Sequence, residues 1–99
     1  MWLVGLYEGE GYFGIRKVTP VMFLKMTDAD VVNKAAWMLE HEKSLYTAIL
    51  PSGKTTYALH IAGDKAAEIM EQFEPYMCTR NALRIREILE KRRIWRKRP

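Results

Sequence analysis

The stretch that organises the chain is Met1-Trp2-Leu3-Val4-Gly5-Leu6-Tyr7-Glu8-Gly9-Glu10-Gly11. Its apolar residues predict a short helix, although each glycine costs a helix about 1 kcal/mol relative to alanine. Gly5 and Gly9 are four residues apart and therefore share one face, where the backbone of a second helix can approach closely. Glu8 and Glu10 lie where the helix ends, which is the end whose dipole disfavours an acid, so a cation there would offset the cost.

These residues resemble the LAGLIDADG motif of homing endonucleases, in a Glu-Gly-Glu-Gly variant followed by the aromatic pair Tyr12-Phe13. Residues 24–32 are similar to the strand-to-helix junction of phage and bacterial members of this family. The resemblance implies a homing-type DNA endonuclease, encoded by a phage or mobile element and acting in the cytoplasm of the bacterial or phage-infected cell. The alternative is a short buried helix that ends at glycines and carries two solvated acids.

The length of 99 residues predicts a single domain over residues 1–99 with a modest hydrophobic core. The longest apolar run is too short to span a bilayer and lacks a signal-peptide cleavage pattern, so we expect no membrane partner. The single cysteine, Cys78, excludes an intramolecular disulfide and fits a reducing compartment.

The formal net charge of +4 is unevenly distributed along the chain. Residues 91–99 form a basic C-terminal tail with six Lys or Arg and no acid, whereas residues 1–90 carry a net charge of −2. Residues 11–27 and 43–63 also contain no acid. If these two stretches form one sheet, that sheet is the electropositive face of the domain. The tail is either a solvated end or a phosphate contact in a DNA complex.

Alternation of apolar and polar residues predicts strands over residues 12–18, 44–50 and 55–61. Residues 21–26 are apolar on both faces, so alternation is weak there, and the returning strand follows mainly from the resemblance to the LAGLIDADG family. Its core face would carry Met22, Leu24 and Met26, and its other face Val21, Phe23 and Lys25. Turn signals lie at Thr19-Pro20 and at residues 51–54. The order α-ββ-α-ββ-α-α predicts an α+β fold in which helices cover one face of an antiparallel four-stranded sheet. The resemblance to the LAGLIDADG family implies the same architecture.

Helical spacing predicts three helices after the first. One runs to about His41 after an N-cap at Thr27 or Asp28, and the next starts at Gly63-Asp64 and ends at Pro75. Thr79 or Asn81 caps the last helix, which frays from Arg92 onward. The predicted core positions of strands and helices are Phe13, Ile15, Met22, Leu24, Met26, Val32, Ala35, Ala36, Leu39, Tyr57, Leu59, Ile61, Ala66, Ile69, Met70, Phe73, Ala82, Ile85, Ile88 and Leu89.

The resemblance also implies a metal site at the end of the first helix. In the family the second motif acid binds a divalent metal with help from backbone carbonyls, which corresponds here to Glu10 and Gly9 with Mg²⁺ (or Mn²⁺). Such a metal supplies the Lewis acid and the activated water that phosphodiester hydrolysis needs. Glu8 is either a supporting residue or a direct metal contact.

Two further catalytic positions follow from the resemblance alone. The polar residue near the metal corresponds to Asp28, and the basic residue corresponds to Arg80. The alternatives are a helix cap for Asp28 and a solvated surface position for Arg80. Because arginine keeps its charge, Arg80 would act electrostatically rather than by proton transfer.

A single copy of the motif implies that two chains pair around a two-fold axis on a pseudo-palindromic double-stranded DNA site. The predicted homodimer interface consists of Trp2, Gly5, Leu6 and Gly9. The outward face of the sheet fits the DNA major groove. Its candidate contacts are Tyr12, Gly14, Arg16, Val18, Lys25, Tyr46, Lys54, Ala58 and His60.

A second interpretation uses the same scaffold without catalysis. The outward face is poor in the Arg, Gln and Asn residues that read base edges, which favours a catalytically inactive DNA- or RNA-binding module, either a regulator or a splicing cofactor. The acid at Glu10 favours the nuclease, because a pure binding module has no use for it. Fold alone does not separate the two.

Overall fold

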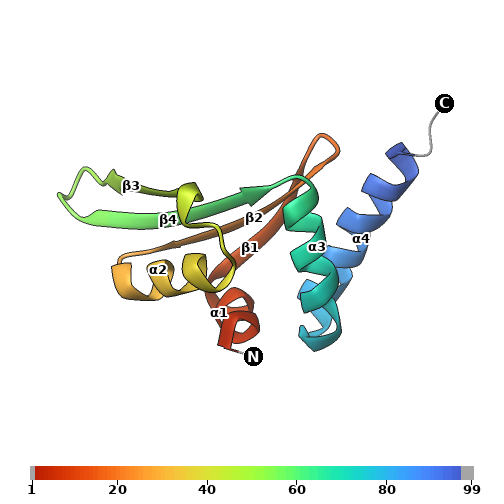
Figure 1. The fold of residues 1–99 in the computed structure, drawn as a ribbon, viewed down its shortest axis with the longest axis horizontal. Helices are drawn as coiled ribbons and strands as arrows, with labels where there is room; N and C mark the ends of the chain where they lie inside the picture. The colour runs from red at the N-terminus through yellow and green to blue at the C-terminus, as the bar shows by residue number, and fades with distance from the viewer. Residues whose placement is uncertain (1, 97–99) are drawn as a thin grey trace.

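Two antiparallel hairpins form a single four-stranded sheet, and helices cover one of its faces (Figure 1). The computed structural model describes residues 2–96 of the chain. The strands are β1 (Gly11–Arg16), β2 (Thr19–Met26), β3 (Leu45–Ile49) and β4 (Thr55–Ala62). The helices are α1 (Trp2–Glu10), α2 (Ala29–Met38), α3 (Asp64–Phe73) and α4 (Thr79–Arg96), with short 3₁₀ turns η1 (Glu42–Ser44) and η2 (Glu74–Tyr76). The predicted α+β class and element order are confirmed.

The strands lie in the order β1-β2-β4-β3, so the two hairpins meet where β2 pairs with β4. β1 and β3 are therefore the edge strands. α4 lies against the β1 edge, because Arg84 Nε donates a hydrogen bond to the carbonyl oxygen of Phe13 at 3.3 Å. The hairpin of β3 and β4 instead projects past α2, and four of the five residues of β3 are exposed (Figure 1). Only one of the two edges is thus covered by another element.

The turn of the first hairpin differs from the prediction. Arg16 pairs with Thr19, so the turn consists of residues 17–18, and Lys17 adopts a positive φ of 58°. Thr19-Pro20, predicted as the turn, instead begins β2. A proline is tolerated at the start of a strand, because its missing N–H interrupts few ladder hydrogen bonds there.

The end of α2 also differs, since the helix stops at Met38 rather than near His41. Glu40 takes a positive φ of 57°, and the His41 amide donates to the Ala36 carbonyl oxygen at 2.8 Å. This pattern is a Schellman motif, in which glycine is the usual left-handed residue. Because a glutamate occupies that position here, the sequence carried no signal for the helix end.

α4 is longer than predicted at its C-terminal end. Arg92 pairs with Asp64 at the start of α3, and Arg96 Nη2 lies 3.4 Å from the same carboxylate. The Arg92 guanidinium, with Arg96 beside it, holds the pKa of Asp64 below its usual value. The prediction that the helix frays from Arg92 is therefore wrong up to Arg96, and residues 97–99, like residue 1, lie outside the described residues.

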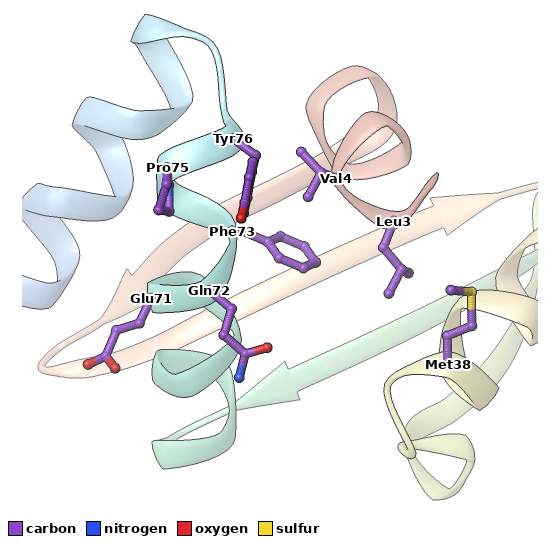
Figure 2. A pocket seen from close by; sticks show the side chains of 8 residues that line it. All are labelled: Leu3, Val4, Met38, Glu71, Gln72, Phe73, Pro75 and Tyr76. Atoms are coloured by element: carbon purple, nitrogen blue, oxygen red, sulfur yellow. The ribbon is translucent and has the colours of Figure 1, made fainter. Parts of the chain in front are cut away.

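α1, α2 and the end of α3 surround an apolar hollow of 510 Å³ on the helical side of the molecule (Figure 2). Leu3 and Val4 line it from α1, and Met38 lines it from α2. Phe73 and Tyr76 add aromatic rings from α3 and η2, and the remaining lining residues are Glu71, Gln72 and Pro75. The first helix is thus bordered by apolar surface that a single chain leaves open.

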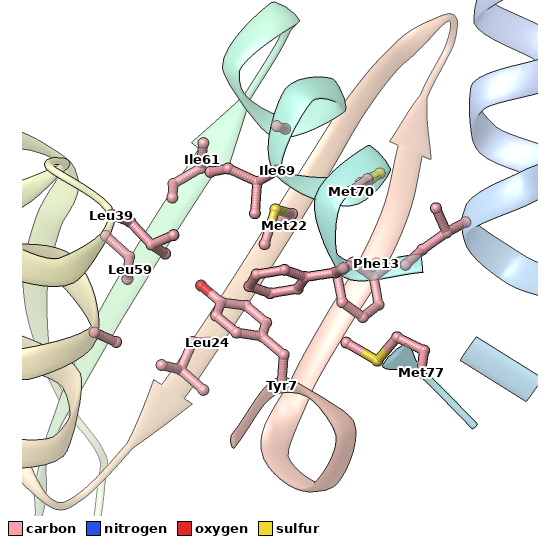
Figure 3. Close-up of a cluster of buried hydrophobic side chains, with 14 of the residues drawn as sticks. Tyr7, Phe13, Met22, Leu24, Leu39, Leu59, Ile61, Ile69, Met70 and Met77 are labelled. Carbon is pink, nitrogen blue, oxygen red and sulfur yellow. The ribbon is translucent and has the colours of Figure 1, made fainter. Parts of the chain in front are cut away.

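The core lies between the sheet and the helices and joins α1, β1 and α3 through three rings (Figure 3). The Tyr7 ring centroid is 5.8 Å from that of Phe13 and 5.7 Å from that of Phe73. Ring pairs at such distances contribute beyond the area they bury. Most of the predicted core positions are buried or packed against the core; Met22, Leu24, Val32, Leu59, Met70, Ile85 and Ile88 are completely buried.

Candidate functional site

α1 carries the motif, and Tyr7 is the one residue of this nine-residue helix that is buried. At 3.6 residues per turn, Gly5 and Gly9 lie on the side opposite Tyr7, and both are exposed. A Cβ atom added at either glycine would meet no other atom within 4 Å. Trp2 shares this side and is 38% exposed, and Leu6 is half-buried. Of the four predicted dimer residues, Gly5 and Gly9 are therefore fully open, whereas Leu6 packs partly against the core and Lys34 Nζ lies 4.4 Å from the centroid of the Trp2 ring.

Glu8 and Glu10 are only two residues apart but have different surroundings. Glu8 Oε2 accepts a hydrogen bond from the Cys78 amide, and Oε1 accepts one from Asn81 Nδ2, both at 3.1 Å. These donors lie at the N-terminal end of α4, where the helix dipole favours a negative charge. Glu8 thus ties the end of α1 to the start of α4. α4 begins at Thr79, so both predicted caps, Thr79 and Asn81, lie inside the helix and that prediction is wrong.

Glu10 is the last residue of α1, and its side chain is exposed. No residue in the described part of the chain forms a hydrogen bond or ion pair with its carboxylate. The next residue, Gly11, starts β1 so close to α1 that an added Cβ atom would lie 2.9 Å from the Tyr7 Cα atom. Only glycine, which lacks a Cβ atom, permits this close contact between β1 and α1. The contact fixes the position of the neighbouring residue, Glu10.

Asp28 and Arg80 lie at the N-terminal ends of two helices. Asp28 is the N-cap of α2, and its Oδ1 accepts a hydrogen bond from the Val31 amide at 3.4 Å, which bears out the predicted capping role. Arg80 is an exposed residue in the first turn of α4, beside Asn81. Through the hydrogen bonds of Glu8, this turn adjoins the C-terminal end of α1.

The outward face of the sheet presents most of the predicted DNA contacts to solvent. Tyr12 is 56% exposed and Tyr46 is 47% exposed. Arg16 and Lys25 are also exposed on the strands, and His60 is half-buried. Val18 and Lys54 lie in the turns of the two hairpins rather than on the face, Val18 half-buried and Lys54 exposed. No acidic residue occurs in any of the four strands, so the positive charge of this face is not neutralised within the sheet.

Two of the predicted contacts need correction because they are buried. Gly14 lies beneath the ring of Tyr12, and a Cβ atom added there would come within 2.6 Å of Tyr12 Cε2. Ala58 is 2% exposed because it sits on the central strand β4 between Lys25 of β2 and Tyr46 of β3, its neighbours in register. Both residues are small and lie close to the backbone of the sheet, and the larger side chains beside them form the solvent-accessible surface of this face.

Phe23 belongs to this face and was not among the predicted contacts. It lies opposite Tyr12 on one side and opposite His60 on the other. Strand alternation had assigned Phe23 outward, but both faces of β2 are apolar in sequence. Its place beside two other rings depends on the register between strands that are distant in sequence.

The described part of the basic tail forms the last turns of α4 rather than a free end. Arg92 and Arg96 pair with Asp64, and Arg93 pairs with Glu90, so acids within the domain compensate three of its charges. Contact of the tail with phosphates stays a prediction.

Comparison of the chain with protein-family models, curated proteins and solved structures found no match. Within residues 2–96, no helix is long and apolar enough to cross a membrane. The same residues contain no group of three or more His, Cys, Asp or Glu side chains that could hold a metal ion. A functional assignment therefore rests on the motif and on the geometry of α1 and the sheet.

Proposed function

We propose that this chain is a site-specific, divalent-metal-dependent DNA endonuclease of the LAGLIDADG homing type that acts as a homodimer. The observation that carries the proposal is the pairing, on one helix, of an open glycine face with an exposed carboxylate at the helix end. Packing two copies through Gly5 and Gly9 would place both Glu10 carboxylates near the two-fold axis. Each would then serve one strand of a pseudo-palindromic duplex.

The residues at the end of α1 fit a divalent metal. Glu10 offers an exposed carboxylate that no other described residue engages, and carboxylate and carbonyl oxygens are the ligands that Mg²⁺ and Mn²⁺ prefer. The carbonyls of the last helical turn, including that of Gly9, lack an intrahelical partner and are available as further ligands. A bound divalent metal supplies a Lewis acid and an activated water for phosphodiester hydrolysis.

The surrounding residues have supporting roles in this proposal. Glu8 already accepts two hydrogen bonds, so it fixes the end of α1 rather than binding the metal. Arg80 provides a permanent positive charge for phosphate oxygens on the turn that Glu8 holds. Arg16 and Lys25 on the outward sheet face would position the duplex through its phosphates and base edges.

Glu10→Gln tests the proposal because it keeps the size of the side chain and removes its charge. Cleavage of supercoiled plasmid and of a randomised duplex library is measured with Mg²⁺ and with EDTA, and duplex binding is measured with Ca²⁺. We expect cleavage by the variant to fall to the level of the parent in EDTA, with binding retained or stronger, because one negative charge facing the phosphates is lost.

Glu68→Gln is the matched control, since Glu68 is an exposed glutamate on α3, and it should cleave like the parent. Cleavage that persists in Glu10→Gln at the parental rate would remove Glu10 from the mechanism.

The second candidate is a binding module that does not cleave. It is favoured by the sheet face, whose exposed rings and basic residues lie on one chain and need neither the carboxylate nor a second copy. A parent that binds nucleic acid but does not nick it with any divalent metal would establish this candidate in place of the nuclease.

A further inference from the structure

The outward sheet face carries a row of rings across three adjacent strands. Tyr12 of β1 lies opposite Phe23 of β2, which lies opposite His60 of β4. The ring centroids of Phe23 and His60 are 6.0 Å apart. Tyr46 of β3 pairs with Ala58, and is therefore a diagonal neighbour of His60.

These rings surround a hollow of 450 Å³ that reaches from β1 to β3. Arg16 and Val21 complete its lining. Arg16 brings a positive charge to one end of the hollow, and Lys25 is exposed on the same face. The hollow therefore combines flat aromatic surface with positive charge and with strands that contain no acid.

We propose that this hollow stacks the unpaired bases of a single-stranded nucleic acid. Every base has a π face that stacks on an aromatic side chain, and the backbone phosphates of the same strand would meet Arg16 and Lys25. A duplex held on the same face through Arg16, Lys25 and its base edges, as in the proposed nuclease, would leave the rings unstacked, because its base faces are covered by their neighbours and only the base edges are exposed in the grooves. Phe23 and Val21 have no side-chain group that could hydrogen-bond to a base edge.

This binding rests on the sheet face of one chain and depends neither on Glu10 nor on the second copy required by the proposed nuclease. A failure of single-strand binding would leave the cleavage test of Glu10 unaffected. A failure of cleavage would likewise leave the hollow as a binding surface. RNA and DNA strands share the stacking chemistry and differ by the 2′-hydroxyl group, so both belong in the test.

The experiment measures fluorescence anisotropy of labelled oligothymidine and oligouridine with the parent protein in EDTA. An abasic strand of the same length and the duplex of oligothymidine with oligoadenine, which is not a selected target site, serve as reference probes. We expect both base-bearing single strands to bind more tightly than the abasic strand and the duplex. Equal affinity for the abasic strand would show that charge alone binds the strand, and tighter binding of the duplex would show that the face reads paired bases. Either result would overturn the proposal.

Tyr12→Leu removes a ring and keeps an apolar side chain, and it should weaken single-strand binding by about 5- to 100-fold. Tyr12→Phe keeps the ring and should bind within about twofold of the parent, because stacking needs the ring and not the hydroxyl. Tyr76→Leu is the matched control, since Tyr76 is 63% exposed but lies on η2 beside the apolar hollow of the helical side. A loss with Tyr76→Leu equal to that with Tyr12→Leu would place the binding elsewhere.

Tyr46→Leu provides a second test that does not disturb the packing of Tyr12 over Gly14. Tyr46 lies on the exposed edge strand, and its loss should weaken binding in the same way but less. A 2-aminopurine base placed within the strand should lose fluorescence on binding to the parent, because stacking quenches it. Unchanged fluorescence with bound parent, or unchanged affinity in both leucine variants, would contradict base stacking.

Discussion

α1 and α3 are matched in composition but differ in burial. Each contains five apolar residues, in a helix of nine residues for α1 and ten for α3. All five apolar residues of α3 are buried, and its polar residues face solvent. In α1 only Tyr7 is buried, while Leu3, Val4 and Leu6 are half-buried and Trp2 is exposed.

The difference indicates that one chain completes the environment of α3 but not that of α1. An amphipathic helix such as α3 needs only the sheet beneath it. A helix that is apolar on several sides is normally enclosed, and α1 has one side on the core and the opposite side open at Gly5 and Gly9. This is the physical basis for expecting a second copy against α1.

The largest loss of folding stability is expected for a substitution in α3. Phe73→Ala should lower the free energy of unfolding by about 3–5 kcal/mol, because it removes a ring that packs against Tyr7 and Phe13 and leaves a cavity. Leu3→Ala on the half-buried side of α1 should cost only about 1 kcal/mol. Urea denaturation at low protein concentration measures both. Equal losses would mean that α1 is as fully packed in one chain as α3.

The next effect concerns association rather than folding. Gly5→Val should raise the dissociation constant of the dimer at least about tenfold, equivalent to about 1.4 kcal/mol, because the added methyl groups hold the two helix backbones apart. The fold of the single chain should survive, since nothing lies within 4 Å of the added Cβ atom. Light scattering over a dilution series measures the dissociation constant.

Gly11→Ala is the matched control for this prediction. Its Cβ atom would meet the Tyr7 ring, with Cδ1 only 2.3 Å away, so this variant should lose folding stability. Gly5→Val should not. A parent protein that stays monomeric at concentrations where it acts on DNA would contradict the dimer and leave the open face of α1 without an explanation.

Most of the fold was predictable because its determinants are local. Apolar periodicity located the buried faces of α2 and α3, and the pair Thr27-Asp28 marked the start of α2, where Asp28 is the cap. The errors fall where the local signal is weak or misleading. Pro20 suggested a turn that the pairing of Arg16 with Thr19 places two residues earlier, and Glu40 ends α2 in a conformation that usually requires glycine.

The candidate site was less predictable because it is assembled from contacts between distant residues. The bonds from Glu8 to Cys78 and Asn81 span about seventy positions, and no spacing in the sequence indicates them. The row that Phe23 forms with Tyr12 and His60 depends on strand register. Register also decides that Ala58 is covered by its neighbours although it alternates outward. The sequence thus predicts which residue types face outward, and only the structure shows which of them meet.

The smallest expected effect on stability concerns the buried side of α1. Tyr7, the one buried residue of this helix, has a hydroxyl group with no hydrogen-bond partner among the described residues. An unpaired buried hydroxyl is costly, so Tyr7→Phe should raise the free energy of unfolding by about 1 kcal/mol. Urea denaturation near neutral pH measures the change. Phe13→Leu, which alters a neighbouring ring without removing a hydroxyl group, is the control and should be destabilising.

Alkaline pH provides an independent test of the same group. Burial raises the pKa of Tyr7 above its usual value, so the hydroxyl ionises in the unfolded chain at a lower pH than in the folded chain. The unfolded state then releases a proton that the folded state retains, and stability falls as the pH rises from the usual tyrosine pKa toward the raised one. Within that window, ionisation of Tyr7 lowers the free energy of unfolding of the parent by about 1.4 kcal/mol per pH unit. Tyr7→Phe should lack this contribution, and the advantage of the variant over the parent should grow with pH. If the variant were less stable than the parent near neutral pH, the Tyr7 hydroxyl would have a hydrogen-bond partner in solution. The buried side of α1 would then contribute more to stability than its burial alone indicates.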